Sequence, residues 1–160
     1  METHTPAITV ATTFFKAFAQ LNANAMCECY QTTAVFNDPV FGLLHYNELT
    51  AMWQMLCANA TNFSLQFETP VAIDHEYVTV SWTASYTFSA TGNKVVNRVK
   101  SYLRIENGYI TEQSDAFKLS RWAAQALGIK GMLLGWSGFV QKRIRKNARK
   151  ALERYIAQRH

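Results

Sequence analysis

The segment Phe36-Asn37-Asp38-Pro39-Val40-Phe41-Gly42 places a carboxylate among large apolar side chains. Loss of water raises the pKa of a carboxylate, and an Asp with a raised pKa is a useful proton acceptor near neutral pH. Pro39 favours an extended backbone at Asp38, and Gly42 allows a following turn. The alternative is an Asp-Pro turn at the end of a hairpin with its carboxylate in water, and this segment alone favours that alternative.

A second carboxylate, Asp115, lies between Ser114 and Ala116, with Phe117 just beyond. Two carboxylates in different environments can divide the roles of acid and base between them. The sequence around Asp115 favours a hydrogen bond to the backbone, or a helix cap, where a strand passes into a helix. We name Asp38 and Asp115 as the candidate catalytic residues.

Helices are expected to position the first half of the chain. Thr5-Pro6 is typical of a helix start, and apolar residues recur at helical spacing as far as about Leu21. Asn22 can cap a short second helix that ends near Tyr30, and Asn47 can cap a third. The apolar face of the third helix consists of Leu49, Met52, Trp53 and Leu56.

Strands are expected to follow, because apolar and polar residues alternate from residue 62 onward. Asn107-Gly108 is a strong signal for a tight hairpin. The strands are predicted at residues 63–67, 77–88, 95–105 and 109–117.

Two further helices close the chain. The first ends at Gly128, and the last follows a cap at Ser137, with residues 131–136 as an apolar linker. The predicted fold is α+β, with helices covering one face of a curved antiparallel sheet. We expect a domain of residues 1–118 and a C-terminal helical extension of residues 119–160 that packs on this domain or on a dimer partner.

The basic charge of the protein is concentrated in its tail. Residues 137–160 carry eight Lys or Arg and one Glu, whereas residues 1–136 carry eight Lys or Arg and ten Asp or Glu. A basic amphipathic helix can bind anionic membranes or nucleic acid. The favoured interpretation is a packed helix with its charges in water, because few aromatic side chains alternate with the basic ones.

Three cysteines, Cys27, Cys29 and Cys57, have no histidines at metal-binding spacing and are expected to be reduced thiols. The sequence also has no phosphate-binding glycine loop and no nucleophile elbow, so we expect no metal and no cofactor. No apolar run is long enough to span a membrane, and the first residues do not form a signal-peptide pattern. A cytoplasmic protein is therefore expected.

The order of these elements resembles the nuclear transport factor 2-like superfamily, which includes SnoaL-like proteins and ketosteroid isomerases. The resemblance covers roughly residues 7–118 and rests on Leu21-Asn22, Tyr30, the segment 34–40 and the segment 103–110. It implies a cone-shaped sheet around an apolar pocket, and often a homodimer formed through the outer face of the sheet. The tail resembles that of SnoaL-like proteins with a basic C-terminal helix.

The resemblance implies a catalytic role for Asp38, which stands where ketosteroid isomerases keep their base. In those enzymes a Tyr and a protonated Asp hold the enolate oxygen. Here Phe14 stands at the Tyr position, and Lys100 or Ser101 at the Asp position. Steroid isomerisation is therefore disfavoured, unless Tyr86, Tyr102 or Asp115 supplies a donor.

A second group of relatives, similar to limonene-epoxide hydrolase, uses an Asp-Arg-Asp arrangement. The nearest match is Arg98-Val99-Lys100, which lacks the first Asp, and the alternation of the strand places Arg98 opposite the apolar face. Only Asp115 resembles the remaining Asp. This activity is favoured less than isomerase-like chemistry.

The resemblance also implies which side chains line the pocket. His45 is more typical of a loop than of a base, and Trp53 and Trp82 are more typical of a core or wall than of a stacking platform. The candidate ligand-binding residues are Phe14, Phe36, His45, Trp53, Trp82, Tyr86 and Ser101.

Three functions remain open at this point. The first is isomerase- or cyclase-like proton transfer on a hydrophobic small molecule, with Asp38 as base and Asp115 as its partner. The second is a non-catalytic module that binds a hydrophobic ligand. The third is association with a membrane or nucleic acid through the basic helix.

Overall fold

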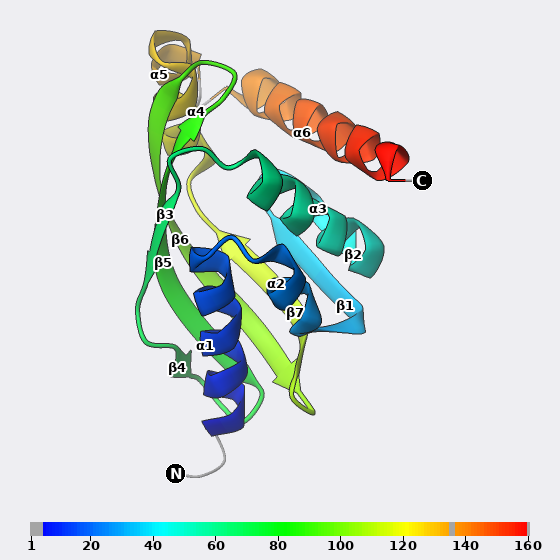
Figure 1. Cartoon of the computed structure of the whole chain (residues 1–160). Helices are drawn as coiled ribbons and strands as arrows, with labels where there is room; N and C mark the ends of the chain where they lie inside the picture. Colours follow the sequence, from blue (N-terminus) through cyan, green and yellow to red (C-terminus); the bar gives the residue numbers. More distant parts are fainter. Residues whose placement is uncertain (1–4, 135–136, 160) are drawn as a thin grey trace.

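The computed structural model describes residues 5–134 and 137–159, in which a curved, open sheet is covered on one face by helices (Figure 1). The α+β prediction is confirmed. The helices are α1 (Thr5–Ala19), α2 (Ala23–Glu28), α3 (Tyr46–Asn59), α4 (Leu119–Leu127), α5 (Ile129–Leu134) and α6 (Gly138–Gln158). The strands are β1 (Tyr30–Asp38), β2 (Gly42–His45), β3 (Ser64–Phe67), β4 (Val71–Ala72), β5 (Tyr77–Phe88), β6 (Asn93–Glu106) and β7 (Tyr109–Ala116).

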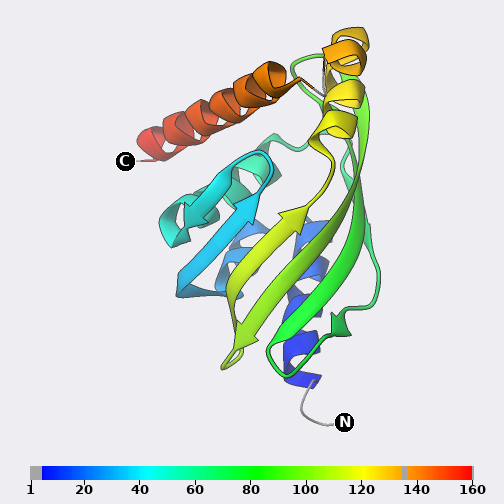
Figure 2. The ribbon, with the colours of Figure 1, turned by 180° about the vertical axis from the view of Figure 1, so that it is seen from behind.

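The strands form a single sheet in the order β2-β1-β7-β6-β5-β3, with β4 paired to β5. Helices α1, α2 and α3 lie in front of this sheet in Figure 1, and Figure 2 shows the opposite face of β5, β6 and β7, with α4 at one end of these strands.

The alternating pattern of the long strands accounts for this arrangement. Val78, Val80 and Trp82 of β5 are buried against the helices, while the Thr and Ser residues between them lie on the other face. The predicted hairpin between β6 and β7 is confirmed, because Asn107 and Gly108 both adopt positive φ angles of 53° and 82°.

The parallel pairing of β1 with β7 was not predicted. Phe36 lies opposite Gln113, and Asn37 lies opposite Ser114. Extending the same register by one residue brings Asp38 beside Asp115. Because side chains alternate along a strand, the two carboxylates share the face on which Phe36 and Gln113 are buried.

An aromatic cluster fills the space between α1, α3 and the sheet. Phe14 makes edge contacts with Tyr30 and Trp53, with ring centroids 5.5 and 5.7 Å apart, and Phe18 contacts Trp53 and Trp82. Phe14 has no exposed surface. This cluster forms the floor on which the candidate site is built.

Several predicted boundaries are corrected by the structure. Tyr30 begins β1 instead of ending α2, whereas Asn22 caps α2 as predicted by accepting a bond from the Ala25 amide. His45, not Asn47, precedes α3. The predicted linker over residues 131–136 is helical as far as Leu134, and its last two residues lie outside the described chain.

Helix α6 packs on its own chain, against α3 and the β1–β2 hairpin. Leu152 is its one buried side chain among the described residues, at 1% exposure. Arg149 forms an ion pair of 3.4 Å with Glu48 of α3 and donates to the carbonyl oxygen of Phe41. Arg145 Nε donates to the carbonyl oxygen of Pro39 at 2.8 Å. The hairpin that carries Asp38 is therefore bonded to α6.

The state of the cysteines and the length of the helices were both considered in the sequence analysis. Cys27, Cys29 and Cys57 are free thiols, and burial raises the pKa of each to about 11. None of the helices formed by residues 5–134 and 137–159 is long and apolar enough to cross a membrane.

A glycine substitution tests the packing of α5. A side chain at Gly131 would overlap the carbonyl group of Ala123 in α4, so Gly131→Ala should lower the free energy of unfolding by about 1–3 kcal/mol. The matched control is Gly138→Ala at the start of α6, where a side chain meets no atom within 4 Å and a small stabilisation is expected. Urea unfolding measures both, and equal effects would contradict this packing.

Candidate functional site

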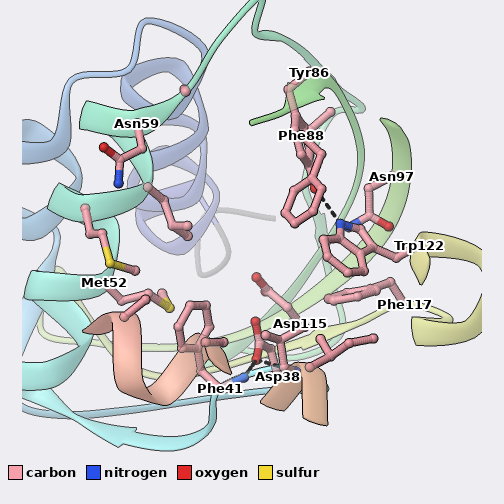
Figure 3. A pocket seen from close by; sticks show the side chains of 18 of the residues that line it. Asp38, Phe41, Met52, Asn59, Tyr86, Phe88, Asn97, Asp115, Phe117 and Trp122 are labelled. Atoms are coloured by element: carbon pink, nitrogen blue, oxygen red, sulfur yellow. Dashed lines mark hydrogen bonds between the residues drawn. The ribbon is translucent and has the colours of Figure 1, made fainter. Parts of the chain in front are cut away.

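A cavity of about 710 Å³ opens between the curved sheet, α3 and α6. Its volume falls in the range of about 300–1,000 Å³ that is usual for small-molecule sites. The walls are mostly apolar and aromatic and include Phe36, Met52, Trp82, Phe88 and Phe117. Figure 3 shows Asp38 and Asp115 close together at one end of this cavity, which is the end formed by β1 and β7.

Asp38 is held by the turn that follows it. Its Oδ1 accepts hydrogen bonds from the amides of Val40 at 2.9 Å and Phe41 at 2.6 Å. Burial raises the pKa of Asp38, and the amides of Phe41, Val40 and Gly42 oppose this rise because they stabilise the ionised form. The predicted Asp-Pro turn is thus present, but the carboxylate faces an apolar cavity instead of water.

Asp115 is held by side chains, and the expectation that it bonds backbone or caps a helix is wrong. Its Oδ1 accepts a 2.5 Å bond from Ser101 Oγ and a 3.1 Å bond from Gln113 Nε2. In the described chain no polar side-chain atom is buried without a partner. Both bonds go to Oδ1, and Asp115 is one of the residues that line the cavity.

The partners of Asp115 are themselves fixed by two buried aromatic residues. Trp82 Nε1 donates to Ser101 Oγ at 2.8 Å. Tyr30 donates to Gln113 Oε1 at 2.5 Å, which turns the amide nitrogen of Gln113 towards Asp115. Trp53 Nε1 in turn donates to the Tyr30 hydroxyl at 3.0 Å. The network orients one carboxylate from both sides.

Burial raises the pKa of Asp115 to about 7. The bonds from Ser101 and Gln113 lower it, and the neighbouring carboxylate of Asp38 raises it further. A carboxyl group with this pKa is partly protonated at neutral pH. The pair therefore combines a carboxylate stabilised by backbone amides with a carboxylic acid that can give up a proton.

Tyr86 lies on a different wall of the cavity from the two carboxylates (Figure 3). Trp122 Nε1 of α4 donates to its hydroxyl oxygen at 2.7 Å, which leaves the Tyr86 hydroxyl proton to be donated elsewhere. Burial raises the pKa of Tyr86, so the hydroxyl keeps this proton at neutral pH. Asn97 lies near Trp122 and adds an amide to the same wall.

The structure separates the predicted ligand-binding residues into three groups. Phe36, Trp53, Trp82 and Tyr86 line the cavity with the two carboxylates. Ser101 is fully buried behind Asp115 and acts through it. Phe14 and His45 lie outside the cavity: Phe14 is enclosed in the aromatic cluster, and His45 is exposed at the end of β2.

Other residues of the site were missed by the sequence analysis. Gln113 and Tyr30 support Asp115, and Trp122 supports Tyr86. Gln113 could have been found from its place two residues before Asp115, which puts both side chains on one strand face. The α6 residues that line the cavity are Val140, Arg143, Ile144, Asn147, Ala148 and Ala151.

The hydrolase-like arrangement is not formed. Arg98 is exposed on the outer face of the sheet, where its β5 partner is Thr83, as the alternation predicted. Arg143 is the one basic side chain among the described residues that line the cavity. The described chain also has no group of three or more His, Cys, Asp or Glu side chains placed to hold a metal ion.

Comparison with protein families identifies the domain. Residues 11–113 match the SnoaL-like domain, and the match covers more than half of the chain. The chain belongs to the SnoaL-like family. No curated protein sequence matches it. The matched region of this SnoaL-like chain holds Asp38, Tyr86, Ser101 and Gln113, and it ends two residues before Asp115.

Solved structures share the fold of this SnoaL-like domain. A proposed polyketide cyclase from Xanthomonas campestris aligns with a TM-score of 0.66 and 14% identity over 78% of this chain and 99% of that one. IdmH, a proposed polyketide cyclase from Streptomyces antibioticus, aligns with a TM-score of 0.64 and 18% identity over 79% of this chain and 100% of its own chain. An epoxide hydrolase from M. tuberculosis, similar to limonene-epoxide hydrolase, aligns with a TM-score of 0.64 and 17% identity over 86% of this chain and 96% of its own chain. These similarities show the nuclear transport factor 2-like fold.

The hydrogen bond from Ser101 can be tested through the titration of Asp115. Ser101→Ala removes a donor that stabilises the ionised carboxylate, so the pKa of Asp115 should rise above its wild-type value of about 7. Carboxyl NMR titration measures this shift. Ser114→Ala, on the opposite face of β7, is the control and should leave the pKa unchanged. A pKa of Asp115 that falls in Ser101→Ala would contradict the network.

Asp115 also makes folding stability depend on pH. Its pKa is about 7 in the folded chain and 3.8 for the free group, so the folded state binds the extra proton between these values. The stability that this group contributes is therefore fully present below about pH 4 and is lost as pH rises through about 7. Asp115→Asn removes this loss and should be more stable than the wild type at about pH 8 by about 1–3 kcal/mol. Urea unfolding at about pH 5 and pH 8 tests this, and a difference that is the same at both would count against it.

Proposed function

We propose that this SnoaL-like protein catalyses proton transfer at a carbon next to a carbonyl group of a hydrophobic, polyketide-like substrate. The observation that carries the proposal is the pair of carboxyl groups at the end of an apolar cavity, one stabilised as an anion by amides and the other with a pKa of about 7. The polyketide cyclases among the structural neighbours support the choice of substrate class.

In the proposed reaction, the Asp38 carboxylate removes a proton from the carbon next to the carbonyl. The electron pair of that C–H bond forms the C=C bond of an enolate, and negative charge develops on the carbonyl oxygen. Oδ2 of Asp115 or the hydroxyl of Tyr86 donates a hydrogen bond to this oxygen. These two groups would replace the donors that ketosteroid isomerases use.

The enolate then has two outcomes. If the proton returns at another carbon, the substrate is isomerised. If the enolate carbon attacks a second carbonyl of the same molecule, a C–C bond forms, and Asp115 can protonate the resulting alkoxide. Both outcomes share the first proton transfer, so that step is the one to measure.

Hydrogen–deuterium exchange tests the role of Asp38. Aromatic and polyketide-like ketones incubated with the protein in deuterium oxide should lose their signal from the carbon-bound proton next to the carbonyl in proton NMR spectra. Asp38→Asn should slow this exchange at least about 100-fold, because it removes the base. Quenching of tryptophan fluorescence by the ketone, from Trp82 and Trp122 in the wall, should be retained.

Asp74→Asn is the matched control for Asp38→Asn. Asp74 accepts hydrogen bonds from the amides two and three residues ahead, as Asp38 does, but it is exposed and lies outside the cavity. Exchange in Asp74→Asn should equal that of the wild type. Binding of a ketone with no exchange in any protein would instead support a non-catalytic binding module.

Tyr86→Phe tests the proposed donor to the carbonyl oxygen. Loss of one such donor typically lowers kcat about 100-fold or more, with a smaller effect on KM. Tyr102→Phe on the outer sheet face is the control. The rate should also fall as pH rises through about 7, because Asp115 then loses the proton that it donates. An unchanged rate in Tyr86→Phe would remove Tyr86 from the mechanism.

A further inference from the structure

One face of α6 presents a column of exposed basic side chains. Lys142, Lys146, Lys150 and Arg154 recur every four residues, all are exposed, and Arg143 lies beside them. Phe139 precedes Lys142 by three residues and lies on the same face. We call Lys142, Lys146, Lys150 and Arg154 the basic column.

The surrounding sequence contains no compensating acidic residues. From residue 116 to residue 152 there are nine Lys or Arg and no Asp or Glu. Glu153 is the single acidic residue of α6. Arg145 and Arg149 point to the hairpin and α3, so the positive charge of the basic column faces outward from the protein.

Apolar side chains are exposed at the N-terminal end of the same column. Ile129 and Phe139 are each 73% exposed and Met132 is 67% exposed, the highest values among the large hydrophobic residues of the described chain. Figures 1 and 2 show α5, which carries Ile129 and Met132, at the same end of the molecule as the start of α6. We call Ile129, Met132 and Phe139 the apolar tip.

We infer that the basic column and the apolar tip dock the protein on an anionic lipid bilayer. Lys and Arg side chains are attracted to such a surface, and exposed apolar side chains can enter the boundary between head groups and acyl chains. Phe139 of the apolar tip lies on the same face of α6 as the basic column, and α5, which carries Ile129 and Met132, lies at the same end of the molecule as the start of α6. Neither is used by the proposed proton transfer, so this inference stands apart from it.

Two other partners fit these observations less well. Nucleic acid would be bound by the cations and would find one aromatic side chain, Phe139, for stacking, but it would leave Ile129 and Met132 without a role, because stacking on bases needs aromatic side chains. A second copy of the chain in a two-fold dimer would bring like charges of the two columns together. A bilayer uses both the cations and the apolar tip.

The place of the cavity supports a lipid surface as well. Val140 and Ile144 line the cavity from α6, so one helix carries the basic column outward and forms a cavity wall inward. Docking through α6 would bring this wall next to the bilayer. A hydrophobic ligand dissolved in the membrane would then be released close to the cavity.

Sedimentation with lipid vesicles tests the inference on the full chain. We expect binding to vesicles of phosphatidylcholine with about one third phosphatidylglycerol, and at least about tenfold weaker binding to phosphatidylcholine alone. Binding should weaken as salt rises from about 0.1 M to about 0.5 M, because salt screens the cations.

Two sets of variants separate charge from apolar contact. The triple variant Lys142→Glu, Lys146→Glu, Lys150→Glu should lower the affinity for anionic vesicles at least about tenfold. The control is Lys94→Glu, Arg98→Glu, Lys100→Glu, which makes the same change of charge on exposed positions of β6 and should lower it less. Phe139→Ser with Met132→Ser should remove the binding that persists at high salt. All these side chains are exposed, so circular dichroism should report an unchanged fold.

Other results would overturn the inference. These are equal loss of vesicle binding in both triple variants, binding to a DNA or RNA duplex in preference to anionic vesicles, or no vesicle binding with a dimer that Phe139→Ser dissociates. The last two results would assign the surface to nucleic acid or to a second copy of the chain.

Discussion

The parallel pairing of β1 with β7 brings the two carboxylates of the site together. Asp38 and Asp115 are far apart in the sequence, and they meet because Phe36 lies opposite Gln113 and Asn37 opposite Ser114. A shift of this register by one residue would turn one carboxylate to the other face of the sheet. The aromatic cluster between α1, α3 and the sheet and the walls of the cavity are arranged around this contact.

Two physical effects on the charge of a carboxylate oppose each other at this site. Burial in an apolar cavity disfavours charge, whereas hydrogen bonds to a carboxylate favour it. Backbone amides supply those bonds to Asp38, and Ser101 and Gln113 supply them to Asp115. Because Asp115 is more deeply buried than Asp38 and the two sets of donors differ, neighbouring carboxyl groups have different affinities for a proton. The network through Tyr30 and Trp53 keeps Asp115 in place despite the cost of its burial.

Much of the fold could be predicted because it depends on local patterns. The alternation in β5 and β6, the Asn107-Gly108 turn and the Asn22 cap each have a signal within a few residues. The carboxylates could be named from their apolar neighbours. Pairing between strands far apart in sequence has no such signal, so the bond from Tyr30 to Gln113 was missed. For the same reason, the covering of the cavity by α6 could not be predicted from its apolar stripe. His45 and Phe14 were assigned to the site by resemblance, and neither lies in the cavity.

The hydrogen bonds between α6 and the hairpin join a helix outside the region of the family match to the part of the matched domain that carries Asp38. Arg145 and Arg149 hold the carbonyl oxygens of Pro39 and Phe41, in the turn whose amides hold Asp38. The matched region ends at residue 113, so α6 and the Trp122 that orients Tyr86 lie beyond it. Two proteins with the same SnoaL-like domain can therefore differ in ligand choice and in the position of their catalytic base through their C-terminal extensions alone. Transfer of function between such relatives needs a comparison of these extensions as well as of the shared domain.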